Sequence, residues 1–134
     1  ALHAPVVIPA ALSLLKLVSW SDRDASLKNK DAKDLLFLFK TYEEIPEVSD
    51  WIFEHSDIRE KLDWDIQRAS AYKLGVDAAG IATKQTKAHL AKIQNNLINK
   101  RPYEMLLEDM CGNIERDFEN NRQLLDAYFQ GFNR

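Results

Sequence analysis

The sequence predicts an all-α fold, a helical bundle of about five to seven helices with a short extended N-terminal segment. Apolar residues recur at helical spacing of three and four along most of the chain. Four glycines and four prolines in 134 residues are few for an all-β fold, which needs many turns. By its length we expect the chain to form a single helical domain over residues 1–134, and its 46% hydrophobic and 29% charged residues are typical of a globular protein.

The N-terminal segment is the one stretch with strand character. Val6, Val7 and Ile8 are β-branched residues that favour extended backbone. A lone strand needs a partner for its edges, so we expect either a short arm or the last strand of a sheet that lies outside this sequence.

A helical hairpin from Ile8 to Tyr42 organises the rest of the chain. Pro9 suits the first turn of the first helix, and a polar and cationic stripe follows at steps of three and four. The stripe consists of Ser13, Lys16, Trp20 and Arg23. The side of the helix that we expect to be buried consists of Leu14, Leu15, Leu17 and Val18.

The second helix of the hairpin follows a charged turn over residues 21–29. Asn29 is the expected N-cap, which places Asp31 and Asp34 in the first two turns, where they complement the helix dipole. Since a short loop joins the two helices, we expect an antiparallel pair that brings Lys16 and Arg23 near Asp31 and Asp34.

This charge cluster has two interpretations. In a polar pocket wall, Lys16 and Arg23 would bind phosphate or carboxylate, and Asp31 or Asp34 would orient a cation, a base or a ribose hydroxyl. The other interpretation is a structural ion-pair network, which the spacing taken alone favours because both kinds of cluster look the same in sequence.

The remaining helices are marked by capping and breaking residues. A short helix from Pro46 should dock on the hairpin, and Thr83 can cap a helix that runs to about Asn99. Asp57 with Glu60 resembles a capping box for a helix that Gly75 would terminate. Further signals are the break at Gly80, the helix start at Pro102, the bend or split at Gly112, and an apolar C-terminal stripe of Leu124, Leu125, Tyr128, Phe129 and Phe132.

Charge and cysteine content restrict the function classes. A net charge of −3 does not favour non-specific nucleic-acid binding, although residues 84–101 form a locally basic segment. The basic side chains of that segment would bind phosphates or face solvent, and the lack of interleaved aromatic residues favours solvent. They are Lys84, Lys87, Lys92, Lys100 and Arg101. Cys111 cannot form an internal disulfide, and with His3, His55 and His89 it has no zinc-site spacing.

The expected location is cytoplasmic, without a membrane segment. The apolar run from Val6 to Leu15 is too short to span a bilayer, and Lys16 ends it. No basic segment precedes this run, which argues against a secretory signal.

One stretch of the chain resembles a known family. The pattern Ile8-Pro, Leu15-Lys-Leu, Trp20-Ser-Asp-Arg23 and Lys30-Asp-Ala-Lys-Asp-Leu35 is similar to the C-terminal helical part of bacterial predicted nucleotidyltransferases of the AbiEii-like abortive-infection toxin group. Leu74-Gly-Val-Asp-Ala-Ala79 is a weaker match to a segment further along some members. The resemblance covers the first third of the chain well and the middle loosely.

The resemblance implies a C-terminal fragment of a longer, nucleotidyltransferase-like protein. Lys16, Asp31 and Asp34 match positions near the family's nucleotide site, with Mg²⁺ and a nucleoside triphosphate bound in the full-length protein. The family's metal-binding carboxylates lie in an N-terminal domain with a Gly-Ser turn and an Asp-x-Asp pair. This chain has no Gly-Ser, and its Asp-x-Asp, Asp63-Trp64-Asp65, occurs in an expected helical context. We therefore expect no catalysis by this chain alone and a missing N-terminal nucleotidyltransferase domain as its partner.

An alternative function is a non-enzymatic helical protein–protein interaction domain. An antitoxin or a second copy in a homo-oligomer would then bind its surface, and the acidic balance and C-terminal aromatic residues would serve that partner.

Overall fold

The computed structural model describes residues 4–22, 25–94, 101–112 and 117–134, and its regular elements there are all helical. This result confirms the predicted all-α class. The elements are α1 Ala4–Asp22, α2 Ala25–Thr41, the short 3-10 helix η1 Tyr42–Glu44, α3 Pro46–Glu54, α4 Ser56–Lys61, α5 Ile66–Ile81, α6 Lys84–Gln94, α7 Arg101–Cys111 and α8 Phe118–Phe132.

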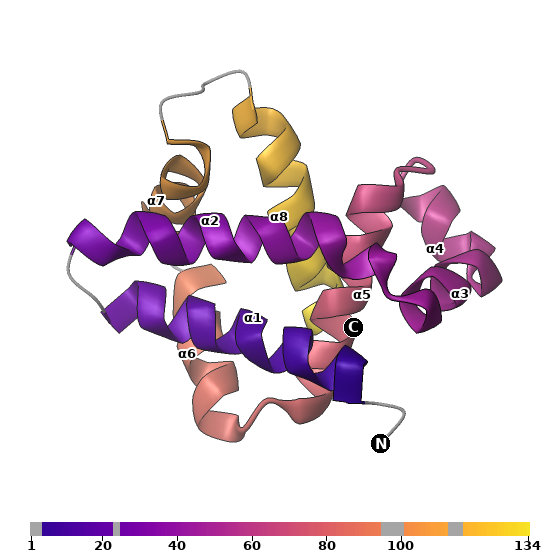
Figure 1. Ribbon diagram of the computed structural model, residues 1–134. Helices are drawn as coiled ribbons and strands as arrows, with labels where there is room; N and C mark the ends of the chain where they lie inside the picture. The colour runs from indigo at the N-terminus through magenta and orange to yellow at the C-terminus, as the bar shows by residue number, and fades with distance from the viewer. Residues whose placement is uncertain (1–3, 23–24, 95–100, 113–116) are drawn as a thin grey trace.

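Helices α5 and α8 form the centre of the bundle, and their mutual interface is the most extensive in the molecule. Helices α1 and α2 lie side by side in front of this pair, and both contact α5 (Figure 1). Helix α6 contacts α1 and α7, while α7 also contacts α2 and α8. Helices α3 and α4 lie together at one end, on the right of Figure 1.

The α5–α8 interface depends on two glycines. A Cβ atom added to Gly75 would lie 2.0 Å from the Tyr128 carbonyl oxygen, and one added to Gly131 would lie 2.0 Å from the Tyr72 carbonyl oxygen. The two backbones therefore approach more closely than any side chain at these positions allows. Gly75, which the sequence predicted as a helix terminator, instead lies inside α5 and sets its contact with α8.

The predicted extended N-terminal segment is wrong for the residues that the structure describes there. Helix α1 begins at Ala4, so Val6, Val7 and Ile8 are helical and Pro9 lies inside the helix rather than in its first turn. Intrinsic propensities disfavour β-branched residues in a helix only weakly. Adding residues to an existing long helix is easier than forming a strand without a partner.

The predicted N-cap at Asn29 is also wrong, because α2 begins at Ala25. Asp31 and Asp34 consequently lie in the middle of the helix, where complementing the helix dipole does not account for them. Their role depends instead on the helix beside them.

The helix expected from Asp57 to Gly75 is divided into α4 and α5. Helix α4 has no side-chain cap, so the predicted capping box of Asp57 and Glu60 is wrong. The chain turns at residues 62–65, and the Asp65 carboxylate accepts a hydrogen bond from the Arg68 backbone N–H at 3.1 Å, which caps α5. The Asp63-Trp64-Asp65 segment therefore lies in a turn and not in a helix.

Several other boundaries agree with the sequence. Helix α3 begins at Pro46, the Thr83 hydroxyl caps α6 by accepting from the Thr86 N–H at 3.1 Å, and α7 ends just before Gly112, whose φ is +60°. The predicted break at Gly80 does not occur, since α5 continues to Ile81. The C-terminal apolar stripe is buried in the bundle, and none of the described helices has the length and apolar character needed to cross a bilayer.

Candidate functional site

The candidate site lies on the seam between α1 and α2. The Lys16 ammonium of α1 lies 2.8 Å from an Asp34 carboxylate oxygen and 3.6 Å from an Asp31 carboxylate oxygen, both on α2. The antiparallel packing of the two helices therefore brings together three of the four predicted residues. Arg23, the fourth, lies outside the described residues.

The two aspartates differ in their environment. Asp31 is 1% exposed, whereas Asp34 is 40% exposed and the Lys16 side chain 21% exposed. The hydrogen bond to Asp34 raises the pKa of Lys16, and the negative charges of Asp34 and Asp31 add to this effect while burial opposes it. Lys16 is thus fixed as a cation between a buried and a half-exposed carboxylate.

The contacts of this cluster limit its chemistry. Lys16 is already paired with Asp31 and Asp34, and Asp34 is the more exposed of the two carboxylates. Such a surface can accept a hydrogen bond from a hydroxyl or attract a cation, and Lys16 can bind phosphate after it leaves one aspartate.

The stripe that was predicted to line a polar face is mostly buried. The Ser13 hydroxyl donates to the Ala10 carbonyl oxygen at 2.7 Å and lies 3.0 Å from the Tyr128 hydroxyl of α8. The Trp20 indole N–H donates to an Asp109 carboxylate oxygen of α7 at 2.8 Å. Lys16 is the stripe residue at the seam, while Leu15, predicted to be buried, is 62% exposed.

A serine, a histidine and an aspartate also meet, between α1 and α6. The Ser21 hydroxyl lies 2.5 Å from His89 Nε2, and an Asp22 carboxylate oxygen lies 3.6 Å from the same nitrogen. In a catalytic triad, the acid would contact the other ring nitrogen. The Ser21 hydroxyl also donates to the Val18 carbonyl oxygen at 2.9 Å, a contact within its own helix.

A second polar cluster was not predicted from the sequence. The Tyr42 hydroxyl donates to the Asp77 carboxylate, whose other oxygen lies 2.8 Å from the Lys73 ammonium. Burial, and next the Asp77 hydrogen bond and charge, raise the pKa of Tyr42 well above its usual value. The spacing of Lys73 and Asp77 at i and i+4 was the available signal, but only the fold places Tyr42 beside them.

The basic segment is partly described by the structure. Lys84, Lys87 and Lys92 are exposed on α6, whereas the side chains of Lys100 and Arg101 lie outside what the structure describes. Among the described residues, no three His, Cys, Asp or Glu side chains lie close enough to hold a metal ion.

Comparisons of the chain with models of protein families, with curated proteins and with solved structures found no match.

Proposed function

We propose that this chain is the helical C-terminal domain of a nucleotidyltransferase-like protein and that its α1–α2 seam forms one wall of a nucleotide or acceptor site. The observation that carries the proposal is the Lys16–Asp31–Asp34 cluster, in which a surface lysine bridges a buried and a half-exposed carboxylate. The sequence pattern that resembles the nucleotidyltransferase group contains these same three residues.

The role of each group follows from its exposure. Asp31 is buried and positions Lys16, and Asp34 can accept a hydrogen bond from a ribose or acceptor hydroxyl. When a triphosphate approaches, the Lys16 ammonium can exchange Asp34 for a phosphate oxygen and neutralise charge there. The metal-binding carboxylates would come from another domain, so this chain would bind without catalysing.

The surface of α1 beside the seam supports docking of that other domain. Ile8, Leu12 and Leu15 recur at i, i+4 and i+7, and they are 64%, 37% and 62% exposed. An apolar stripe of this kind is the usual face of a helix that packs against another element.

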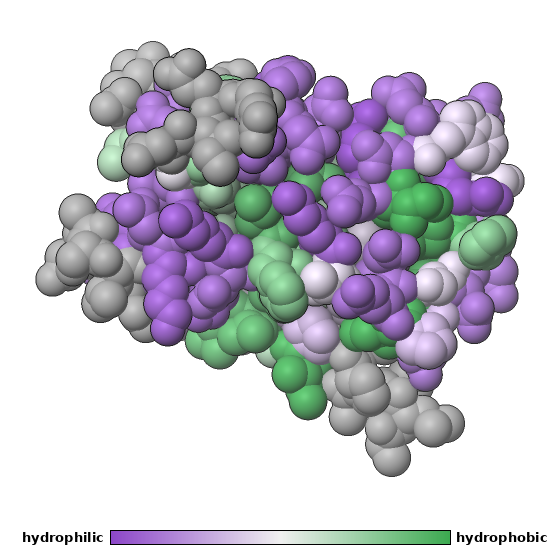
Figure 2. Space-filling model, turned by 45° about the horizontal axis from the view of Figure 1, so that its top comes forward, coloured by the Kyte–Doolittle hydropathy of each residue, from purple (hydrophilic) through white to green (hydrophobic). Residues whose placement is uncertain are grey.

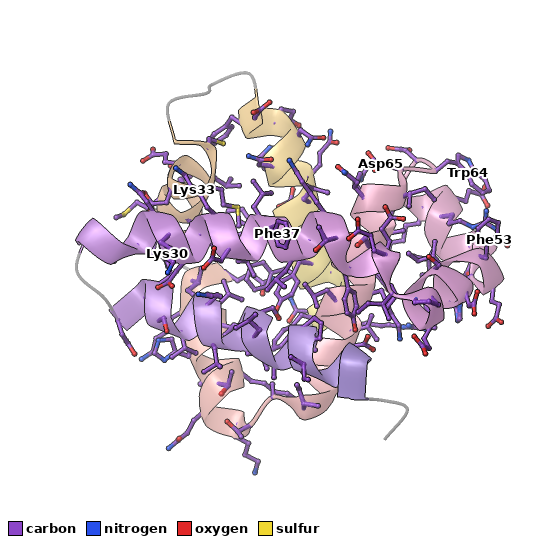
Figure 3. All side chains as sticks on the ribbon, in the orientation of Figure 1. Lys30, Lys33, Phe37, Phe53, Trp64 and Asp65 are labelled. Atoms are coloured by element: carbon purple, nitrogen blue, oxygen red, sulfur yellow. The ribbon has the colours of Figure 1, made fainter. Side chains whose placement is uncertain are left out.

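The test is nucleotide binding to the full-length protein, measured by calorimetry with each of the four ribonucleoside triphosphates and Mg²⁺. We expect Lys16→Met to weaken binding about tenfold, since a charge-assisted contact to phosphate is lost. Lys33→Met is the matched control, because Lys33 is an exposed lysine next to Asp34 on α2 (Figure 3).

Unchanged affinity in Lys16→Met would contradict the proposal. Equal losses in Lys33→Met would also contradict it, because the effect would then be one of general charge.

The exposed stripe of α1 also favours a second candidate, a non-enzymatic helical interaction domain that binds an antitoxin or a second copy. Leu15→Glu would then abolish the complex in sedimentation experiments while nucleotide binding stayed absent in every variant. In the accessory-domain proposal, the same substitution weakens nucleotide binding because it displaces the other domain.

A further inference from the structure

Two exposed aromatic rings stand at the α3–α4 end of the molecule, away from the α1–α2 seam. Phe53 is 73% exposed and Trp64 is 57% exposed, and both labels lie at this end in Figure 3. Figure 2 shows apolar residues in green between polar ones on the same side. Large apolar side chains that remain together on a surface mark an interaction site more often than scattered ones do.

The backbone holds Trp64 in an unfavourable conformation. Asp63 and Trp64 have φ values of 59° and 62°, which a bulky side chain rarely adopts. The Trp64 backbone N–H donates to the Arg59 carbonyl oxygen at 2.7 Å and fixes the turn. Glycine would make the same turn with less strain, so the fold alone does not account for tryptophan here.

Arg59 orients both rings. Its guanidinium carbon lies 5.4 Å from the ring centroid of Phe53 and 5.4 Å from that of Trp64, and its Nη2 donates to the Phe53 carbonyl oxygen at 3.1 Å. Beside them is a hollow of about 230 Å³, which suits one bulky apolar side chain. Its lining residues are Glu43, Ser49, Ile52, Phe53, Arg59 and Ile66.

The surroundings of this hollow are strongly acidic. Residues 43–65 contain nine Asp and Glu residues against Arg59 and Lys61, a formal charge of −7 in a chain whose total is −3. Among these acids, Asp63 alone has an ion-pair partner within the described part of the chain, Arg68 at 2.9 Å. The other acids lack such a neutralising partner among the described residues, so this end of the molecule carries a negative potential.

We propose that the α3–α4 end binds a basic segment of a partner protein, which inserts one bulky apolar side chain into the hollow and lays Arg or Lys side chains across Phe53 and Trp64. The acidic surface attracts such a segment, and aromatic faces favour cations. The same charge repels nucleic acid and anionic membranes. A second copy docked through the same face would place two acidic surfaces against each other, so a separate partner is the occupant.

The probe is a capped peptide with one central leucine between two arginines in a glycine–serine background. We expect it to shift the indole N–H resonance of Trp64 but not that of buried Trp20, whose indole is bonded to Asp109. Binding should weaken with added salt, because surface charges are screened. Peptides with serine for leucine, or glutamates for the arginines, should bind at least about tenfold more weakly.

Matched variants separate this site from general effects, with affinity measured by calorimetry. Phe53→Ala should weaken binding about tenfold while Phe37→Ala, at another exposed phenylalanine, should not. Trp64→Gly should lose binding without losing stability, because glycine relieves the strained turn.

The charge requirement has its own pair of variants. Neutralising Glu54 and Asp57 with the double substitution Glu54→Gln and Asp57→Asn should weaken binding and reduce its salt dependence. Neutralising two exposed acids on α7, Glu104→Gln and Glu108→Gln, is the control.

Three results would overturn the proposal. The first is equal binding of the glutamate peptide or of a single-stranded oligonucleotide. The second is a loss in Phe37→Ala as large as that in Phe53→Ala. The third is a concentration-dependent self-association that Trp64→Gly abolishes, which would make a second copy the occupant.

Discussion

At the residue scale, the seam between α1 and α2 shows which contacts a sequence can reveal. Lys16, Asp31 and Asp34 were expected to meet because a short loop forces two helices to lie antiparallel, and the structure brings them within ion-pair distance. The burial of Ser13 and Trp20 could not be predicted. Their partners, Tyr128 and Asp109, come from helices about ninety or more residues away along the chain.

The buried member of the cluster makes Lys16 important for stability as well as for the proposed binding. Lys16→Met leaves the Asp31 carboxylate buried without this ammonium, and we expect it to lower the free energy of unfolding by about 2 kcal/mol. Lys33→Met, at an exposed lysine, should change the free energy of unfolding by no more than about 0.5 kcal/mol. Urea unfolding of both variants measures the difference, and a loss in Lys33→Met as large as that in Lys16→Met would contradict this account.

At the element scale, α5 shows why a glycine is ambiguous in sequence. An isolated glycine in a helical pattern indicates either a terminator or a close approach of two backbones. Gly75 and Gly80 both lie inside α5, but only Gly75 faces another helix at close range. The distinction depends on the position of α8, whose Gly131 lies more than fifty residues away.

These two glycines give a matched pair of substitutions in one helix. Gly75→Ala should destabilise the protein by about 3 kcal/mol, because the new methyl group would overlap the Tyr128 carbonyl oxygen. Gly80→Ala should stabilise it by about 0.5 kcal/mol, since nothing lies within 4 Å and alanine favours the helix. Thermal unfolding of the two variants checks both signs, and a neutral Gly75→Ala would show that the helices can separate freely.

The turn before α5, residues 62–65, was also not predicted from the sequence. Asp57 to Gly75 has the apolar spacing of one continuous helix, and periodicity alone cannot show a break of four residues within it. Asp65 was a usable signal, because an aspartate three residues before Arg68 can cap a new helix. The left-handed conformations of Asp63 and Trp64 had no such signal.

At the scale of the whole molecule, the fold class follows from composition and periodicity, whereas the arrangement of helices does not. The apolar stripes predicted the burial of residues such as Leu14, Leu17 and Leu125. Helices α5 and α8 form the central pair because Gly75 and Gly131 allow their backbones to approach closely, and this contact could not be predicted from the sequence. The proposed nucleotide wall rests on one predicted contact and on a family resemblance, so its function stays a prediction.

The whole molecule should lose stability in alkali. Burial raises the pKa values of Tyr42 and Tyr128 far above the usual 10.0. Above pH 10 the unfolded chain therefore releases protons that the native protein keeps, and its free energy of unfolding falls as the pH rises. Each such tyrosine contributes a slope of about 1.4 kcal/mol per pH unit.

Tyr42→Phe tests this dependence. The variant should differ from the parent by a constant amount between pH 7 and pH 9, and its loss of stability above pH 10 should be shallower by one tyrosine's contribution. Urea unfolding at a series of pH values measures the slopes, and identical slopes for the two proteins would show that Tyr42 titrates normally.

The single cysteine makes one motion of the bundle directly observable. Cys111 is the last residue of α7, is 9% exposed, and its sulfur accepts a hydrogen bond from the Asn121 side-chain amide of α8 at 3.3 Å. Because Cys111 is largely buried, movement of the end of α7 away from α8 should speed its modification by a thiol reagent. The rate of thiol modification under native conditions therefore reports this local opening, and the measurement needs no engineered label.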